Sequence, residues 1–380
     1  MSKILHINSE YSNRPLYRNL VKYLDKKGFE QHIYVPVRRA SDIAKNQTEE
    51  TTKTTFTYSF ILNPALRLLY YRKTQKIFRD ICKNIDVRNY ELVHAHTLFT
   101  NGGPAYRLKK KFGIPYILAI RNTDLTIFYK YFPHIRGFGR KVLKNASVIV
   151  LISPSWKEKL KKIIPEAEWP EIERKCRIIP NAVEEYWLKN RPEHISKAKA
   201  DYIEILYAGR FIKRKGLHYL MKALDLLNED KEKYRLTLIG GGGNYDKQIR
   251  SMAAQRNFVT VREQMSKEQL TEAYRQADIF AMPSHSETFG LVYIEAMSQG
   301  LPVLYAKNEG IDKLFKDHTI GLAAEHDNPE DIADKLLQIE QQREQFAKNA
   351  LEQSANFSWE NVSEKYADVY LPVIENQKNA

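Results

Sequence analysis

The stretch Met282–Val303, MPSHSETFGLVYIEAMSQGLPV, predicts a loop and a helix placed between two buried strands. Residues 278–282, which are apolar after Asp278, are typical of one strand, and Val303–Ala306 is typical of the next. Between them a Pro-Ser loop leads into a helical run, which Gly300 and the proline two residues later should end. Strands that alternate with helices at this spacing indicate an α/β domain with a parallel sheet.

The helix in this stretch begins where a phosphate group could bind. A helix that starts after a loop leaves its first backbone N–H groups without internal acceptors, and its dipole makes that end positive. The free donors would be the amides of Gly290, Leu291 and Val292, which predict an anion seat. Glu295, one turn further on, would face the hydroxyls of a ribose, and Glu287 would point across the phosphate. The ordinary alternative is that both carboxylates only compensate the helix dipole.

The segment SHSETFGLVYIEAMSQGLPV closely resembles the Glu-x7-Glu signature of the retaining glycosyltransferases of family 4. The resemblance implies an α/β chain with the GT-B fold, in which two Rossmann-like domains with parallel sheets face each other across a cleft. It also implies that Glu287 contacts the donor sugar and that the amides after Phe289 and Gly290 bind the diphosphate. Glu295 would then bind the ribose of the donor nucleotide.

A basic loop, GRFIKRKGL, follows the strand predicted over residues 202–208. Arg210 comes directly after that strand and Lys215 directly before a helix, where two cations can neutralise a diphosphate. The alternative is a basic loop in a basic protein. In the family that the chain resembles, the same Gly-Arg-x4-Lys-Gly spacing binds the donor diphosphate. Gly241 lies in a run of four glycines that resembles the family's glycine turn near the nucleotide, and no Gly-Lys-Ser/Thr follows to make a P-loop.

The first residues of the chain predict a strand–helix–strand unit, with strands over 3–8 and 31–37 and a helix over 16–27. Residues 40–57 are polar and rich in threonine, and we expect them to form an exposed loop. Residues 66–84 predict a basic helix, which is either an ordinary surface helix or a contact for anionic lipid or an anionic acceptor.

The length of 380 residues predicts two domains. We expect an acceptor-binding domain over residues 1–190 and a nucleotide-sugar-binding domain over 191–357. A polar stretch at about 184–201 would link the two. A terminal helix, within about 358–380, should pack back on the first domain, as in the family.

Two histidines close the strand predicted over residues 91–96. His94 and His96 share one face because side chains alternate along a strand. The family shows a similar His-x-His strand end in the wall of its acceptor cleft. Zinc needs at least three protein ligands and no third is apparent, so we expect no metal site.

The next strand, over 116–120, ends in Arg121-Asn-Thr-Asp124. Many relatives have His-Gly-x-Asp here, with the histidine near the reacting carbon of the donor sugar. Arg121 cannot act as a base because it stays protonated. The N–H groups of its planar guanidinium can, however, pair with phosphate or sugar hydroxyls. For Asp124 we expect a helix cap rather than an acceptor contact.

Charge is divided unequally along the chain, whose net charge is +14. Residues 1–190 carry 35 Lys/Arg and 17 Asp/Glu, a net of +18, whereas residues 191–380 carry 25 and 29, a net of −4. The contrast indicates an N-terminal half that meets anionic material, although a lysine-rich composition explains part of it. The aromatic and basic segment 128–138 would be either a packed lid under the cleft or a platform for an acceptor or membrane. No base-reading motif accompanies these cations, which speaks against nucleic acid as a partner.

Two cysteines exclude a disulfide framework. No apolar run approaches the roughly 20 residues that span a bilayer. We therefore expect a cytoplasmic protein. The basic half and the aromatic segment lead to the hypothesis that it attaches peripherally to the inner face of the membrane.

The resemblance, together with these features, implies a retaining transferase that moves a sugar from a UDP- or GDP-sugar to a glycan or lipid-linked acceptor in cell-surface polysaccharide biosynthesis. The residues expected to act in catalysis are Arg121, Arg210, Lys215 and Glu287, and those expected to bind the nucleotide are Gly241, Phe289, Gly290, Leu291, Val292 and Glu295. No Asp-x-Asp motif is evident, so we expect a reaction without metal or cofactor. The alternative is a non-catalytic protein of the same shape that binds an anionic polymer or membrane, which the arginine at position 121 would favour. A third hypothesis is that the protein is an epimerase or hydrolase of nucleotide sugars with the same fold.

Overall fold

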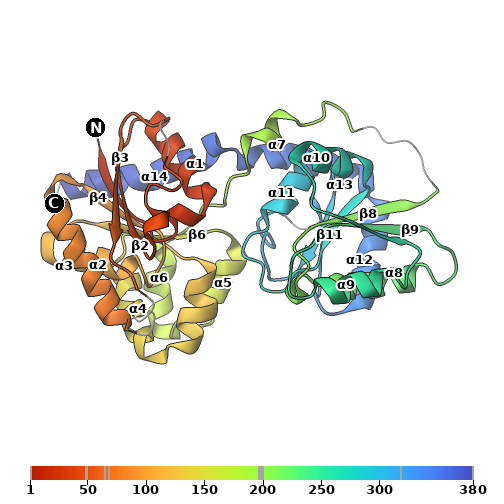
Figure 1. Ribbon diagram of the computed structural model, residues 1–380, viewed down its shortest axis with the longest axis horizontal. Coiled ribbons are helices and arrows are strands. Elements are labelled where there is room, and N and C mark those ends of the chain that lie inside the picture. The colour runs from red at the N-terminus through yellow and green to blue at the C-terminus, as the bar shows by residue number, and fades with distance from the viewer. Residues whose placement is uncertain are drawn as a thin grey trace. The chain divides into compact units, whose positions relative to one another are not determined.

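The computed structural model describes residues 2–47, 50–63, 66, 69–195, 201–316 and 319–378. The chain divides into two compact units (Figure 1). The N-terminal unit contains residues 1–152, 157–180 and 359–380, and the C-terminal unit contains 153–156 and 181–358.

The N-terminal unit is built on a seven-stranded sheet with the order β3-β2-β1-β4-β5-β6-β7, in which all neighbouring strands are parallel. The strands are β1 (Lys3–Ile7), β2 (Glu30–Val37), β3 (Thr54–Phe60), β4 (Leu92–Ala95), β5 (Tyr116–Ala119), β6 (Val148–Leu151) and β7 (Cys176–Ile178). The helices are α1 (Pro15–Lys26), α2 (Tyr70–Asn84), α3 (Gly102–Phe112), α4 (Pro133–Asn145), α6 (Trp169–Lys175) and α14 (Trp359–Lys378), together with most of α5 (Pro154–Lys161).

The C-terminal unit is built on a six-stranded parallel sheet with the order β10-β9-β8-β11-β12-β13. The strands are β8 (Ile203–Gly209), β9 (Tyr234–Gly240), β10 (Val259–Arg262), β11 (Ile279–Met282), β12 (Val303–Ala306) and β13 (Gly321–Ala324). The helices are α7 (Glu185–Lys189), α8 (Leu217–Leu227), α9 (Asp246–Ala253), α10 (Lys267–Gln276), α11 (Leu291–Ser298), α12 (Pro329–Gln341) and α13 (Arg343–Ser354).

Both sheets reverse their strand order once, and this decides where a ligand can bind. The reversal falls between β1 and β4 in the N-terminal sheet and between β8 and β11 in the C-terminal sheet. In doubly wound α/β sheets, ligands bind at the carboxyl ends of the strands beside such a switch point. The two α/β sheets confirm the fold class expected from the sequence.

Among the described residues, the expected exposed loop over residues 40–57 is confirmed as far as Lys53 and is wrong from Thr54 onward, and its residues 48 and 49 lie outside the described residues. Residues from Thr54 onward form β3, the edge strand, which pairs in parallel with β2. Phe56 and Tyr58 pack against a buried cluster that includes Tyr11 and Val35. The carboxylate of Asp25 in α1 accepts a hydrogen bond from the backbone N–H of Lys53 at 2.8 Å and so anchors the start of the strand.

Other expected boundaries shift by a few residues. The basic helix begins at Tyr70 rather than at residue 66, and residues 67 and 68 of that prediction lie outside the described residues. Part of the expected linker, residues 196–200, also lies outside them, as do 379 and 380 of the terminal segment.

Helix α14 belongs to the N-terminal unit, although it closes the chain. In Figure 1 it is the blue helix among the red and orange elements of that unit. It packs against α1 and β4, and Tyr370 is completely buried there. No helix in the described part of the chain is both long and apolar enough to cross a membrane.

Candidate active site

The C-terminal switch point gathers most of the residues predicted to bind a donor. Strands β8 and β11 are neighbours in the sheet, so the loops that leave their carboxyl ends are neighbours too. The loop after β8 carries Arg210 and Lys215, and the loop after β11 carries Glu287. The predicted cations and the first predicted carboxylate are therefore brought together by the strand order.

Lys215 and Glu287 form an ion pair with 2.6 Å between Nζ and Oε2. The Glu287 side chain also accepts hydrogen bonds from the Ser284 hydroxyl at 3.3 Å and from its neighbour's amide, Thr288 N–H, at 3.0 Å. Arg214, which the sequence interpretation did not single out, lies 4.0 Å from the same carboxylate. Glu287 is only 7% exposed, so these partners hold its carboxylate in one position.

The surroundings of Glu287 keep it ionised. Burial alone would raise its pKa, but the positive charges of Lys215 and Arg214 and the amide of Thr288 outweigh burial, and the pKa is lowered below its usual value. Glu287 is therefore a fixed acceptor for hydroxyl groups at neutral pH and not a proton donor.

A pocket of about 460 Å³ lies beside this pair and is lined mainly by cations of the loop after β8. Its lining residues are Arg210, Ile212, Lys213, Arg214 and Asn244. Of these residues, the sequence analysis predicted only Arg210, because the Gly-Arg-x4-Lys-Gly motif specifies only the residues at its two ends. Lys213 and Arg214 stand between those ends, and their run of positive charge was the available signal.

Helix α11 begins at Leu291, as the sequence predicted, and Gly290 precedes it with φ of +81°. An added Cβ at Gly290 would lie 2.5 Å from ring carbons of Tyr293, so this position needs glycine for both conformation and space. The amides of Gly290, Leu291 and Val292 precede the first turn of intrahelical bonds and are available to an anion. Phe289 is buried and its ring contacts Phe357.

Backbone strain marks the loops around this helix start. Ser286, directly before Glu287, has φ of +57°, and Asn308, in the loop after β12, has φ of +60°. Left-handed backbone at residues other than glycine is uncommon and is often found at functional sites. The Asn308 conformation is supported by its own N–H, which donates to Asp312 at 2.6 Å.

Glu295 occupies the middle of α11, on a partly exposed surface. Burial and the negative charge of Glu184 raise its pKa to about 7, and Lys267 only partly offsets them. Lys267 is itself paired with Glu184. Glu295 is thus a carboxyl group whose charge changes near neutral pH.

The glycine run after β9 serves the protein's own packing. Gly240 has φ of +127°, and a Cβ there would lie 2.1 Å from the carbonyl oxygen of Gly209. A Cβ at Gly243 would lie 2.0 Å from the carbonyl oxygen of Phe211. The run lets the loops after β8 and β9 touch, which positions the cation-lined pocket. Gly241, with φ of +145°, faces the Asp246 and Arg250 side chains of α9.

Arg121 belongs to the N-terminal unit, where it lies against α1 and α14. Its guanidinium lies 5.8 Å from the ring centre of Tyr17 and is hydrogen-bonded to Tyr366. Burial opposes its charge, but Tyr17, Tyr366 and Asp124 outweigh burial, so its pKa is raised and it remains protonated.

Asp124 caps backbone N–H groups, but not those of the helix that begins beside it. Its carboxylate accepts from the amides of Leu98 at 2.9 Å, Phe99 at 3.2 Å and Arg121 at 2.9 Å. The π-helical stretch Asp124–Tyr129 receives no side-chain cap bond. Asp124 therefore fixes the turn that follows β4, and its burial raises its pKa to about 6.

The structure contradicts the expectation that His94 and His96 have no third potential ligand. His6 of β1 lies beside them, because β1 and β4 pair with His6 opposite His94. Sequence spacing could not reveal this group, since 88 residues separate His6 from His94. All three imidazoles are almost completely buried, so they lie beneath the surface of their unit.

Comparison with known proteins places both parts of the chain in glycosyltransferase families. The model of Glycosyltransferase Family 4 matches residues 16–185, and the model of Glycosyl transferases group 1 matches residues 190–353.

Individual relatives agree with the family models. An uncharacterized glycosyltransferase, MJ1178 of Methanocaldococcus jannaschii, is 28% identical over 298 residues, which are 77% of this chain and 77% of that protein. The putative teichuronic acid biosynthesis glycosyltransferase TuaC of Bacillus subtilis is 24% identical over 66% of this chain and 62% of its own length.

Among solved structures, Anabaena Alr3699/HepE in complex with UDP and glucose superimposes with a TM-score of 0.66 at 17% identity, over 97% of this chain and 99% of that one. This likeness concerns the fold. The two family models, which together span most of the sequence, show that the chain is a transferase: it belongs to the family 4 type of glycosyltransferases and has the GT-B fold.

Proposed function

We propose that the protein transfers a sugar, with retention of configuration, from a nucleoside diphosphate sugar to an acceptor hydroxyl, without a metal ion. The donor nucleotide binds the C-terminal switch point. Arg210, Lys215 and the free amides at the start of α11 stabilise the leaving diphosphate. Glu287 orients the donor sugar, and Glu295 accepts the ribose hydroxyls.

The observation that carries this proposal is the cation-lined pocket beside a buried, ionised carboxylate. Arg210, Lys213 and Arg214 line the pocket, and Lys215 reaches Glu287 next to it. A departing diphosphate develops negative charge, so fixed cations and backbone donors stabilise the transition state more than the bound donor. A front-face reaction of this kind needs positioning and charge neutralisation more than a protein nucleophile.

The relatives support a choice of donor and acceptor to test first. UDP is bound to the structurally similar HepE, so UDP-sugars are the first donors to try. TuaC is named for teichuronic acid biosynthesis, which supports a glycan or lipid-linked acceptor in cell-surface polysaccharide biosynthesis.

A basic and aromatic surface of the N-terminal unit supports peripheral attachment to an anionic membrane. Tyr131, Tyr71 and Ile127 are large apolar side chains that remain exposed, and Tyr131 is 64% exposed. Tyr71 donates a hydrogen bond to the carbonyl of His134, which joins α2 to α4. We call Tyr71, Ile127, Lys130 and Tyr131 the aromatic patch. Lys130 lies 5.1 Å from the Tyr131 ring centre and adds the charge that anionic headgroups attract.

The first test is thermal unfolding in the presence of UDP, GDP, ADP or TDP, with a chelator and then with Mg²⁺. A nucleotide at 100 times its dissociation constant should add about 2.7 kcal/mol of stability. We expect one nucleotide, UDP first, to raise the unfolding temperature equally with and without Mg²⁺. Transfer and hydrolysis assays with the matching sugar nucleotides then identify the sugar.

A matched pair of variants locates the nucleotide site. Arg210→Ala should reduce the shift because it removes a pocket cation. Arg235→Ala should not reduce it, because Arg235 lies near the amino-terminal end of β9, whereas the pocket lies at the carboxyl ends of the strands. No shift with any nucleotide, together with no donor hydrolysis, would favour the non-catalytic alternative that binds an anionic polymer. A shift that appears only with Mg²⁺ would overturn metal independence.

A further inference from the structure

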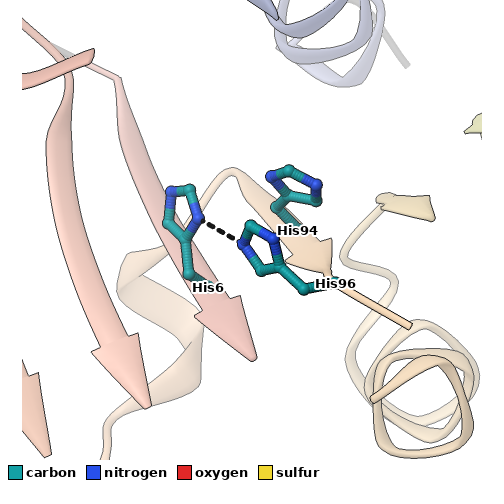
Figure 2. Close-up of side chains that lie close together, drawn as sticks. All are labelled: His6, His94 and His96. Atoms are coloured by element: carbon teal, nitrogen blue, oxygen red, sulfur yellow. Dashed lines mark hydrogen bonds between the residues drawn. The ribbon is translucent and has the colours of Figure 1, made fainter. Parts of the chain in front are cut away.

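Three histidines lie together at the switch point of the N-terminal sheet. His6 is in β1, His94 is in β4 and His96 follows β4 directly. Each imidazole offers one nitrogen, and these three nitrogens lie within 4.8 Å of one another. Figure 2 shows the three rings side by side, with the dashed line joining Nδ1 of His6 to Nε2 of His96 at 3.0 Å.

The three rings keep hydrogen-bonding capacity that the described part of the protein does not use. Nε2 of His6, Nε2 of His94 and Nδ1 of His96 are buried and lack a hydrogen-bond partner there. The nitrogens of His6 and His96 that face each other, Nδ1 and Nε2, share one hydrogen bond, and a bound ion would replace the proton between them. The unpaired Nε2 of His6 and Nδ1 of His96 lie on the other sides of their rings.

One ring is already oriented in the way a metal ligand usually is. Nδ1 of His94 lies 2.6 Å from the hydroxyl of Tyr370, which is completely buried in α14. Histidines that bind metals almost always use their second nitrogen to bond an orienting group, which fixes the tautomer and the ring plane. This contact leaves Nε2 of His94 free for coordination.

We propose that His6, His94 and His96 bind one transition-metal ion of the zinc type in the core of the N-terminal unit. Three imidazoles are an established ligand set for zinc, and they leave one coordination position for a water molecule or small anion. A tetrahedral zinc ion with bonds of about 2.0–2.1 Å holds its ligand atoms about 3.3 Å apart, so small ring rotations suffice. The site is separate from the donor pocket, which lies in the other unit.

The chemistry of the cluster selects among metals. Imidazole nitrogens suit Zn²⁺, Cu²⁺ and Ni²⁺, whereas Mg²⁺ and Ca²⁺ prefer oxygen ligands. Arg121 is a cation in the same region, since the Tyr17 ring lies against both Arg121 and His96, and it would weaken the binding of any dication. The metal would join β1 to β4 and, through the Tyr370 hydroxyl, would strengthen the packing of α14 against the sheet.

The experiment measures Zn²⁺ bound to the full chain produced without a histidine tag. The protein is stripped with a chelator, dialysed and titrated with Zn²⁺, and bound metal is counted by elemental analysis. Co²⁺ provides a second probe, because its visible absorption reports the coordination geometry. We expect one Zn²⁺ per chain and a higher unfolding temperature, and no effect of Mg²⁺ at the same concentration.

Three variants separate the proposal from a purely structural role of the histidines. His96→Gln should lose the bound Zn²⁺. Tyr370→Phe keeps the shape of the ring but removes the group that orients His94, so Zn²⁺ affinity should fall at least tenfold. His285→Ala/His326→Ala removes a histidine pair of the C-terminal unit, whose rings lie 4.5 Å apart, and should leave the stoichiometry unchanged.

These outcomes decide the question even where one variant folds poorly. If His96→Gln is unfolded, the Tyr370→Phe protein still tests the site, since only a hydroxyl is lost. The proposal is overturned if the wild-type chain binds no Zn²⁺, or if the His285/His326 variant loses it. It is equally overturned if Tyr370→Phe binds Zn²⁺ with wild-type affinity. None of these results depends on transferase activity, so they are independent of the proposed function.

Discussion

At the scale of single residues, the Lys215–Glu287 ion pair is a firmly held part of the proposed donor site. Both side chains are largely buried, and the ion pair is short at 2.6 Å. We expect Lys215→Ala to lower turnover at least tenfold, or about 1.4 kcal/mol in activation free energy, because a cation beside the leaving diphosphate is lost. Steady-state transfer or donor hydrolysis measures the change.

Loss of Lys215 also leaves Glu287 buried without its main partner, which destabilises the fold. The double variant Lys215→Met/Glu287→Gln removes both charges and should recover stability but not activity. The single variant must be shown by circular dichroism to be folded. Unchanged turnover in a folded Lys215→Ala protein would refute the diphosphate role.

The raised pKa of Glu295 predicts that the stability of the protein depends on pH. Its pKa is about 7 in the folded protein, above the ordinary value of 4.5. The folded state therefore binds this proton more tightly than the unfolded state, and the free energy of unfolding should fall as pH rises from about 4.5 to 7. The full contribution of one such group is up to about 3 kcal/mol.

Comparison of wild type with Glu295→Gln tests whether this carboxyl group makes stability fall as pH rises. In urea unfolding at pH 5 and pH 7.5, the variant should lose less stability than wild type on going to the higher pH. In the proposed site the carboxylate form of Glu295 accepts both ribose hydroxyls, so nucleotide affinity in wild type should weaken as pH falls below 7. A nucleotide affinity that weakens equally in Glu295→Gln would remove this residue from the ribose site.

At the scale of elements, the position of α11 depends on one glycine. Gly290 has φ of +81°, and a Cβ there would lie 2.5 Å from the Tyr293 ring. The Tyr293 hydroxyl donates to the carbonyl of Met282, so the ring cannot easily yield. We expect Gly290→Ala to cost about 1–3 kcal/mol of stability and to abolish nucleotide-dependent stabilisation, because the amides at the helix start move.

Gly113→Ala is the matched control for this change. Gly113 ends α3 with φ of +76°, close to that of Gly290, but a Cβ there meets nothing within 4 Å. It should therefore cost only the conformational strain, about 1 kcal/mol, and leave nucleotide binding intact. Equal losses of nucleotide stabilisation in both variants would show that α11 does not bind the phosphate.

The sequence predicted the elements whose patterns are local. Strand β12 begins and ends at the predicted residues, because Gly300 and Pro302 mark the boundary before it. Strand β3 was missed because its threonines resemble a polar loop, and its pairing with β2 depends on tertiary packing. Periodicity does not record such long-range contacts.

The difference between local patterns and long-range contacts also explains which side-chain clusters could be predicted. Arg210, Lys215 and Glu287 could be found because motif spacing marks them, and the strand order brings them to one edge. His6 could not be joined to His94, since the contact arises only when β1 and β4 pair. Arg214 was missed for a smaller reason: a third cation in a basic loop has no distinctive spacing.

At the scale of the whole molecule, charge is concentrated in one half of the sequence. Residues 1–190 carry a net charge of +18 and residues 191–380 a net of −4. A basic surface that also exposes aromatic side chains should bind anionic lipid more strongly than neutral lipid, and salt should weaken that binding. Co-sedimentation with phosphatidylcholine vesicles, with and without phosphatidylglycerol, measures both effects.

The aromatic patch makes the membrane prediction specific to a surface rather than to net charge. Ile127→Ser/Tyr131→Ser leaves the charge unchanged but removes apolar area that would enter the interface, so binding to anionic vesicles should fall several-fold. Leu337→Ser changes an exposed leucine of α12 in the acidic half and should have no effect. If wild type binds neutral and anionic vesicles equally, electrostatic attachment is refuted. If the patch variant binds as wild type does, the charge of the N-terminal half acts without the patch.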